Sequence, residues 1–142
     1  MEFRLLGPVE VRDKGSVVPI AAGKERALLA LLLLHSNRTV TRERIIDDLW
    51  GDAAPSSARK MVQVYVSQLR KTLPGDLSIE TRGRGYALVL DPRSLDAARF
   101  ERLLAEGARA RREGNPELAF TVFGRALALW RGRAYGEFGY EE

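Results

Sequence analysis

The sequence predicts an α+β protein, and three observations support this. β-Favouring residues alternate with turn signals over residues 1–20. Helical periodicity then recurs three times, and a glycine-rich two-strand pattern follows the third helix. Two further helical patterns lie beyond Asp96. A chain of 142 residues can hold one ordinary domain or two small ones.

Composition excludes several classes of protein. The 45% hydrophobic content is sufficient for a packed core. The absence of cysteine excludes disulfides and thiolate metal sites, and a single histidine, His35, leaves no histidine cluster for zinc. We therefore expect no metal and no cofactor. A net charge of +4 favours an anionic partner.

No segment predicts insertion into a membrane. The leucine-rich run from Ala27 to Leu34 is shorter than the roughly 20 apolar residues that cross a bilayer. It also lies too far from the N-terminus, and has no small-residue cleavage site, to be a signal peptide. We expect a cytoplasmic protein.

Residues 1–20 predict a small antiparallel sheet. Its strands contain Phe3 and Leu5, then Val9 and Val11, then Val17 and Val18. Turns are predicted at Gly7-Pro8 and at residues 13–15. Paired carboxylates and nucleophile–base spacings are missing from this segment, so it does not indicate catalysis.

The first helix is predicted from Gly23 to Ser36. It is apolar nearly all the way round between Ala27 and Leu34, which is typical of a central core helix. His35 lies at its end, where the helix dipole favours a charged imidazole. With no second ligand in view, a structural role outweighs metal binding.

A second, short helix is predicted from Arg42 to Trp50. Residues 37–40 form a connector before it, and Thr41 is its expected N-cap. Gly51 ends the helix. Its inward residues are expected to be Ile45, Ile46 and Leu49.

The third helix, over residues 56–73, has two distinct faces at 100° per residue. The apolar face consists of Val62, Tyr65, Val66, Leu69 and Leu73. The opposite face consists of Lys60, Gln63, Val64, Ser67, Gln68 and Lys71. No carboxylate occurs between Arg59 and Leu73, whereas a solvated helix usually carries Glu–Lys pairs.

That polar face suits the major groove of DNA. Amides read adenine edges bidentately, a serine hydroxyl donates or accepts, and an exposed valine contacts a thymine methyl. The alternative is a polar face without a partner.

A glycine-rich hairpin is predicted after a break at Pro74-Gly75. Its bend, Gly83-Arg84-Gly85, carries Arg82 and Arg84, which suit a narrow minor groove. A phosphate-cradling loop is the weaker interpretation, because the required helix is replaced by a strand over residues 86–90.

The second and third helices together match a helix-turn-helix, in which the first helix crosses the DNA backbone. Arg38, Arg42 and Trp50 would then lie near phosphates. Trp50 could equally be a core residue, because its ring packs while its N–H reaches an oxygen.

This order of elements resembles the OmpR/PhoB type of winged helix-turn-helix over about residues 1–90, within a predicted domain of residues 1–92. Trp50-Gly51, the helix end Ser67–Leu73 and Thr81–Tyr86 carry the likeness. The resemblance implies the following roles: Gln63, Val64 and Gln68 face bases, with Ser67 on the same face; Lys60, Tyr65 and Arg70 face phosphates, with Lys71 beside them; Arg82 enters the minor groove. The receiver domain of response regulators is missing, so we expect no phosphorylation control within this chain.

A second module is predicted over residues 95–142, after a linker at residues 91–96. One helical stripe contains Phe100, Leu103, Leu104, Gly107, Ala108 and Arg111, and the next contains Ala119, Val122, Phe123, Ala126, Leu127 and Trp130. Asn115 is the expected cap and Pro116 the first residue of the second helix. This pair indicates a TPR-like helical repeat, which needs neighbours to bury its faces.

Residues 96–100 and 126–132 resemble the start of the bacterial transcriptional activator domain. With the winged helix, the whole chain resembles a SARP/AfsR-type regulator of antibiotic and other secondary-metabolite genes. The resemblance implies binding to direct repeats of double-stranded DNA in the bacterial nucleoid, possible dimerisation there, and contact with RNA polymerase and its sigma factor. The family usually has several more helices, so we expect a truncated or minimal member.

A second hypothesis is a protein-interaction module that uses the winged helix and helical pair without touching DNA. The aromatic tail, with Tyr135, Phe138 and Tyr140, would contribute adhesive surface. An enzyme is the weakest hypothesis, because neither a metal constellation nor a nucleophile with a base partner is present.

Overall fold

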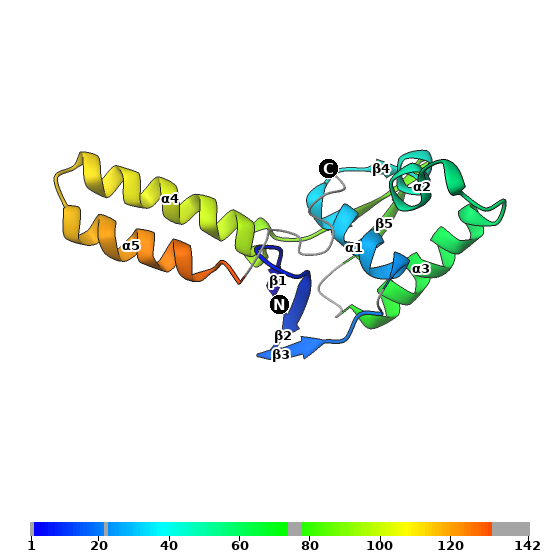
Figure 1. The fold of residues 1–142 in the computed structure, drawn as a ribbon, viewed down its shortest axis with the longest axis horizontal. Helices are drawn as coiled ribbons and strands as arrows, with labels where there is room; N and C mark the ends of the chain where they lie inside the picture. Colours follow the sequence, from blue (N-terminus) through cyan, green and yellow to red (C-terminus); the bar gives the residue numbers. More distant parts are fainter. Residues whose placement is uncertain (1, 22, 74–77, 132–142) are drawn as a thin grey trace. The chain divides into compact units, whose positions relative to one another are not determined.

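The computed structural model describes residues 2–21, 23–73 and 78–131, and confirms an α+β fold (Figure 1). By its contacts the chain divides into two compact units. We name the unit of Asp13–Leu90 the winged unit. The helical unit comprises residues 2–12 together with the helices that follow Asp91. The predicted break at Pro74-Gly75 and the aromatic tail lie outside the described residues. The predicted domain limits, 1–92 and 95–142, stay a prediction.

The winged unit contains three helices and a small sheet. Its elements are β3 (Ser16–Val18), α1 (Lys24–Leu34), β4 (Val40–Thr41), α2 (Arg42–Trp50), a 3-10 turn (Gly51–Ala53), α3 (Ala58–Thr72), β5 (Ser78–Arg82) and β6 (Gly85–Val89). The predicted bounds of α2 are confirmed, as is its cap, because Thr41 Oγ1 accepts from the Arg44 N–H at 3.2 Å. The helices α1 and α3 are shorter than predicted at both ends.

The core of the winged unit forms around α1, as its apolar run predicted. Four leucines of α1 are fully buried, and α1 packs against both α2 and α3. The partners from the other two helices are Ile45, Leu49, Val62, Val66 and Leu69. Leu34 is an exception to the prediction, since it is exposed at the last position of α1.

The sheet of the winged unit has the order β4-β6-β5. Its first strand was predicted as a connector, and this was wrong: Val40 and Thr41 pair with Tyr86 and Gly85 of β6. Two residues carry too little local pattern to reveal a strand that forms only against a distant partner.

The two glycines of the wing act differently. Gly83 has φ +54°, which favours glycine at the bend. Gly85 has no such φ, but a Cβ there would overlap the carbonyl of Val40. Gly83 therefore serves the bend, whereas Gly85 allows β4 to approach β6.

The helical unit combines two N-terminal strands with a helical pair. In antiparallel register, β1 (Glu2–Arg4) pairs with β2 (Glu10–Asp13), so that Phe3 faces Val11. The helices are α4 (Asp96–Arg112) and α5 (Pro116–Ala128). Asn115 caps α5 as predicted, its Oδ1 accepting from the Leu118 N–H at 3.2 Å.

Asp96 connects the strands to α4. The predicted linker at residues 91–96 is wrong at this residue, which is 1% exposed and begins the helix. Its two carboxylate oxygens accept from the N–H groups of Leu5 at 2.6 Å and Leu6 at 3.1 Å. Pro92–Ser94 form a 3-10 turn, and Leu95 bridges to Phe3. No local pattern reveals a hydrogen bond across 91 residues.

The helical pair packs through a small core. Leu103, Val122 and Ala126 are buried, with Phe100 and Leu129 packed against them. The predicted stripes are partly wrong: Leu104, Arg111, Leu127 and Trp130 are exposed, while Ala110 is buried and Leu129 half-buried. The repeat character of the pair stays a prediction. Over the described residues no helix is long and apolar enough to cross a membrane.

Candidate nucleic-acid interface

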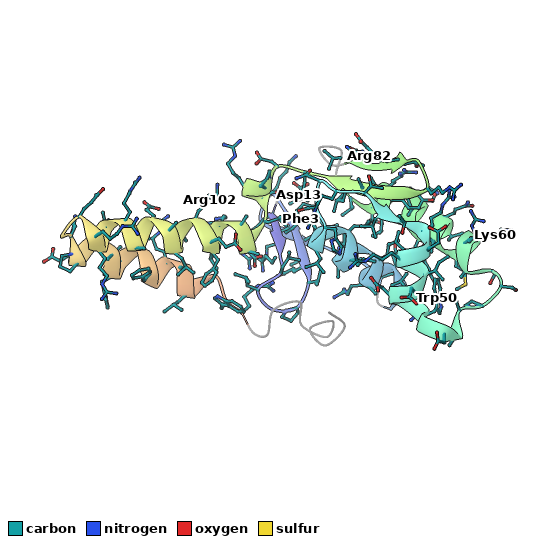
Figure 2. All side chains as sticks on the ribbon, turned by 90° about the horizontal axis from the view of Figure 1, so that it is seen from above. Phe3, Asp13, Trp50, Lys60, Arg82 and Arg102 are labelled. Carbon is teal, nitrogen blue, oxygen red and sulfur yellow. The ribbon has the colours of Figure 1, made fainter. Side chains whose placement is uncertain are left out.

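The outward face of α3 is as the sequence predicted. All six predicted polar-face residues are exposed, and Val64 among them is 46% exposed. The helix has no acidic residue in its first turn and two basic residues, Arg70 and Lys71, in its last. Figure 2 labels Lys60, whose side chain extends outward from the start of α3. The face therefore offers amides, a hydroxyl and cations without a carboxylate.

Trp50 and Tyr65 flank this face and contact each other. Their rings stack with centroids 6.5 Å apart and planes at 23°. The Lys24 ammonium lies 5.7 Å from the Trp50 ring centroid and donates to the Leu49 carbonyl. Both aromatic side chains are half-buried. Of the two interpretations of Trp50, packing is therefore observed, and the phosphate contact stays a prediction.

Arg82 on the wing is paired within its own strand. Its Nη2 lies 2.7 Å from Glu80 Oε2, to which its Nε also donates at 2.8 Å. Both side chains are more than 40% exposed, so solvent weakens the pair. Sequence reasoning missed Glu80, although an i,i+2 spacing places two strand residues on one face.

The bend of the wing is tied to the start of α2. The carbonyl of Arg84 accepts from the Arg42 backbone N–H at 2.9 Å and from its Nε at 3.3 Å. The Arg84 side chain is exposed. Arg42, predicted to lie near phosphates, thus also fixes the wing to the helix-turn-helix.

Arg70 donates hydrogen bonds to two residues of β5. Its Nε and Nη2 donate to the Ile79 carbonyl at 3.0 and 2.6 Å, and Nη2 also lies 3.1 Å from Thr81 Oγ1. The sequence predicted that this guanidinium contacts a DNA phosphate, and that contact stays a prediction. Neither Ile79 nor Thr81 was singled out from the sequence, because a backbone acceptor leaves no trace in residue types.

His35 lies at the end of α1, as predicted, but the expected effect of the dipole is outweighed. Burial lowers the pKa of His35, and the positive charges of Arg44 and Arg38 lower it further. Its Nε2 is buried without a hydrogen-bond partner among the described residues. The neutral imidazole is therefore favoured. Arg38 is exposed just before β4.

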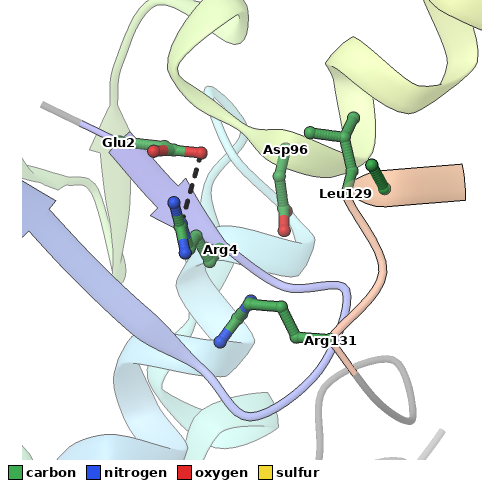
Figure 3. A pocket seen from close by; sticks show the side chains of 6 residues that line it. Glu2, Arg4, Asp96, Leu129 and Arg131 are labelled. Atoms are coloured by element: carbon green, nitrogen blue, oxygen red, sulfur yellow. Dashed lines mark ion pairs between the residues drawn. The ribbon is translucent and has the colours of Figure 1, made fainter. Parts of the chain in front are cut away.

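A small pocket of about 70 Å³ lies in the helical unit (Figure 3). Its basic lining residues are paired: Arg4 Nε lies 3.4 Å from Oε1 of Glu2, and Arg131 Nη1 lies 2.9 Å from Oε2 of Glu10, which is outside the lining. The carboxylate of Asp96 accepts hydrogen bonds from the backbone just after β1. We therefore interpret the pocket as a packing gap and not as a ligand site. Within the described residues no group of His, Asp or Glu side chains could hold a metal ion.

Two family models match the chain. Residues 19–88 match "Transcriptional regulatory protein, C terminal", and residues 95–142 match "Bacterial transcriptional activator domain". The first match contains α1, α2, α3 and the wing, and the second contains α4 and α5.

Named relatives contain both regions. The chain is 35% identical to the regulatory protein DnrI of Streptomyces peucetius, over 94% of this chain and 53% of DnrI. It is 39% identical to the regulatory protein AfsR of Streptomyces coelicolor, over 93% of this chain and 13% of AfsR. The chain thus spans about half of the first relative and a small part of the second.

A solved structure is similar as well. Mycobacterium tuberculosis EmbR, solved in complex with a low-affinity phosphopeptide, aligns with a TM-score of 0.87 and 35% identity. The alignment covers 94% of this chain and 37% of EmbR. The chain combines a transcriptional regulatory domain with a bacterial transcriptional activator domain, and it shares both regions with these regulators. It therefore belongs to the SARP/AfsR-type family of bacterial transcriptional regulators.

Proposed function

We propose that the chain is a sequence-specific, double-stranded-DNA-binding activator without catalytic activity. The observation that carries the proposal is the exposed face of α3, which presents donors and acceptors with no carboxylate. A face of this kind complements base edges and phosphates in a major groove. The arginines of the wing supply the second contact, in the adjacent minor groove.

Each residue of the proposed interface has a proposed role. Contacts to bases are assigned to Gln63, Val64, Ser67 and Gln68. Contacts to phosphates are assigned to Arg38, Arg42, Trp50, Lys60, Tyr65 and Lys71. Arg82 and Arg84 enter the minor groove, and Arg70 is considered separately below.

The biological setting follows from family membership. We propose that the protein acts in the cytoplasm, at the nucleoid, on direct repeats near promoters of secondary-metabolite genes. There it would recruit RNA polymerase with its sigma factor, and two copies would bind adjacent repeats. Regulators such as DnrI and AfsR, which share both regions, support this assignment.

Salt dependence tests the DNA proposal directly. A duplex is first selected from random sequences with the full chain, and affinity is then measured over a range of salt concentrations. Six neutralised phosphates give a log–log slope of about −5, at about −0.9 for each phosphate. A salt-insensitive complex, or the absence of any binding, would refute the proposal.

Single substitutions test the orientation of α3. Gln63→Ala or Gln68→Ala should each cost about 1–3 kcal/mol of binding free energy and relax preference at one base pair. Arg109→Ala, which removes an exposed cation of α4, is the matched control and should change neither. If both glutamine variants retain affinity and preference, α3 is oriented differently.

A second candidate function, protein interaction, is favoured by a different observation. On α5, Phe120 is 81% exposed and Leu127 is 68% exposed, which is unusual for large apolar side chains. Arg82→Ala distinguishes the candidates in a shift assay with random-sequence DNA. Weakened binding supports the DNA proposal, whereas unchanged binding, or none by the wild type, supports protein interaction.

A further inference from the structure

We propose that Arg70 is a positioning residue that fixes the wing to the recognition helix, and that it acts on DNA through Arg82 rather than through a phosphate of its own. This inference rests on the proposed function for its consequence at DNA. Its structural part, the tie between α3 and β5, is independent of DNA.

The acceptor of Arg70 lies on an open edge. In the order β4-β6-β5, strand β5 has a sheet neighbour on one side only. Alternate carbonyls of an edge strand point away from the sheet and need another donor. The Ile79 carbonyl obtains it from Arg70 Nε and Nη2, at 3.0 and 2.6 Å.

The planar guanidinium makes this contact specific. Two of its N–H groups converge on one carbonyl, and Nη2 reaches the Thr81 hydroxyl at 3.1 Å. A lysine would keep the charge but has no rigid fork. The two functions of Arg70, charge and shape, can therefore be separated by substitution.

The tie joins the two elements that would read the two grooves. Arg70 is on α3, two turns beyond Gln63, and Thr81 immediately precedes Arg82 on β5. The side chain of Ile79 is buried in the core, which holds this part of β5 in place. The hydrogen bonds from the Arg70 guanidinium to the Ile79 carbonyl fix the separation between α3 and β5. Such placement matters because a groove contact forms only when the side chain is held within a fraction of an ångström of its position.

The observed contacts compete with the alternative role. A phosphate that took Nε and Nη2 would cost Arg70 three hydrogen bonds, two of them to a carbonyl that would then lose its donor, so only Nη1 can face a phosphate while the contact with β5 is kept. Lys71, the next residue, is exposed and provides a cation in the same turn. It is the matched control for a direct phosphate contact.

A double-mutant cycle on the selected duplex tests the inference. Arg70→Lys should weaken binding by about tenfold in the otherwise wild-type chain, since charged hydrogen bonds are lost. In the Arg82→Ala background it should weaken binding by less than about twofold, because the contact it positions is already gone. Lys71→Gln should cost the same factor in both backgrounds.

An equal cost of Arg70→Lys in both backgrounds would overturn the inference, because Arg70 would then contact DNA independently of the wing. Thr81→Val provides a milder version of the same test. It removes one acceptor of Arg70 without changing any charge, and it should weaken binding in the same direction as Arg70→Lys, by a smaller factor.

Amide hydrogen exchange of the free protein tests the tie without DNA. Arg70→Lys should accelerate exchange in β5 several-fold while α1 amides keep their protection, and Lys71→Gln should leave β5 unchanged. Unchanged β5 exchange in Arg70→Lys would refute the tie. If the wild type binds no DNA but β5 responds as expected, the proposed function fails and the tie stands.

Discussion

The outward faces of α3 and α5 are opposites in chemistry. Helix α3 buries its aliphatic side and exposes amides, a hydroxyl and cations, whereas α5 exposes Phe120 and Leu127 over a small core. The winged unit is held by large leucines around α1. The helical unit has apolar residues of its own buried, such as Phe3 and Leu5, and the buried carboxylate of Asp96 also joins its N-terminal segment to α4. The winged unit thus exposes a polar helix face, while the helical unit exposes an apolar face of the kind that helical repeats bury on a neighbour.

Each unit contains one of the two tryptophans, so the two can be followed separately. Trp50 stacks on Tyr65 in the winged unit. Trp130 meets Phe100 edge-on in the helical unit, with centroids 5.5 Å apart. Fluorescence of Trp50→Phe and Trp130→Phe chains therefore reports one unit at a time.

The largest effect is expected from Asp96→Ala. It leaves the N–H groups of Leu5 and Leu6 buried without an acceptor, which should cost the helical unit about 2–4 kcal/mol of unfolding free energy. Urea unfolding followed by Trp130 measures this loss. Glu101→Ala, at an exposed carboxylate of α4, is the control. If Asp96→Ala lowers both units equally, their stabilities are not separate.

Glycine-to-alanine substitutions should change the unfolding free energy in opposite directions in the two units. Gly85→Ala places a Cβ against the Val40 carbonyl and should destabilise the winged unit by about 1–3 kcal/mol. Gly124→Ala meets open space on α5 and should stabilise the helical unit by about 0.5–1 kcal/mol. The two tryptophan signals read these shifts independently. Equal shifts would contradict the assigned role of Gly85.

Glu80→Gln changes the charge of the wing in the winged unit. Removing the carboxylate frees Arg82 and removes a negative charge from the wing, so DNA affinity should rise, by less than about fivefold for an exposed pair. Titration of the selected duplex measures the change. Glu101→Gln, on an exposed position of α4, should have no effect. A fall in affinity would mean that the pair pre-orients Arg82 for the groove.

The smallest effect concerns the winged unit at mildly acidic pH. The pKa of His35 in the folded chain lies below its ordinary value of 6.5, so the unfolded chain binds a proton first as the pH falls. Stability should therefore be full above about pH 6.5 and decline below it. Unfolding of the Trp130→Phe chain between pH 7 and 5 measures the slope. His35→Gln should flatten it, and a persistent slope would assign it to other groups.

The local features of this protein could be predicted from its sequence. Periodicity identified the helices and the polar face of α3, since side chains three or four residues apart share a face. Capping chemistry identified Thr41 and Asn115, because an N-cap bonds to a residue within the next turn. These interactions span a few residues and leave a mark in residue types.

The pairings between distant segments could not be predicted from the sequence. The strand at Val40–Thr41, the need for Gly85, the Arg70 contact with Ile79 and the Asp96 contact with Leu5 all depend on where another segment lies. Most of their acceptors or donors are backbone groups, which every residue carries. Such groups give the sequence no signal, so the fold alone selects which of them meet.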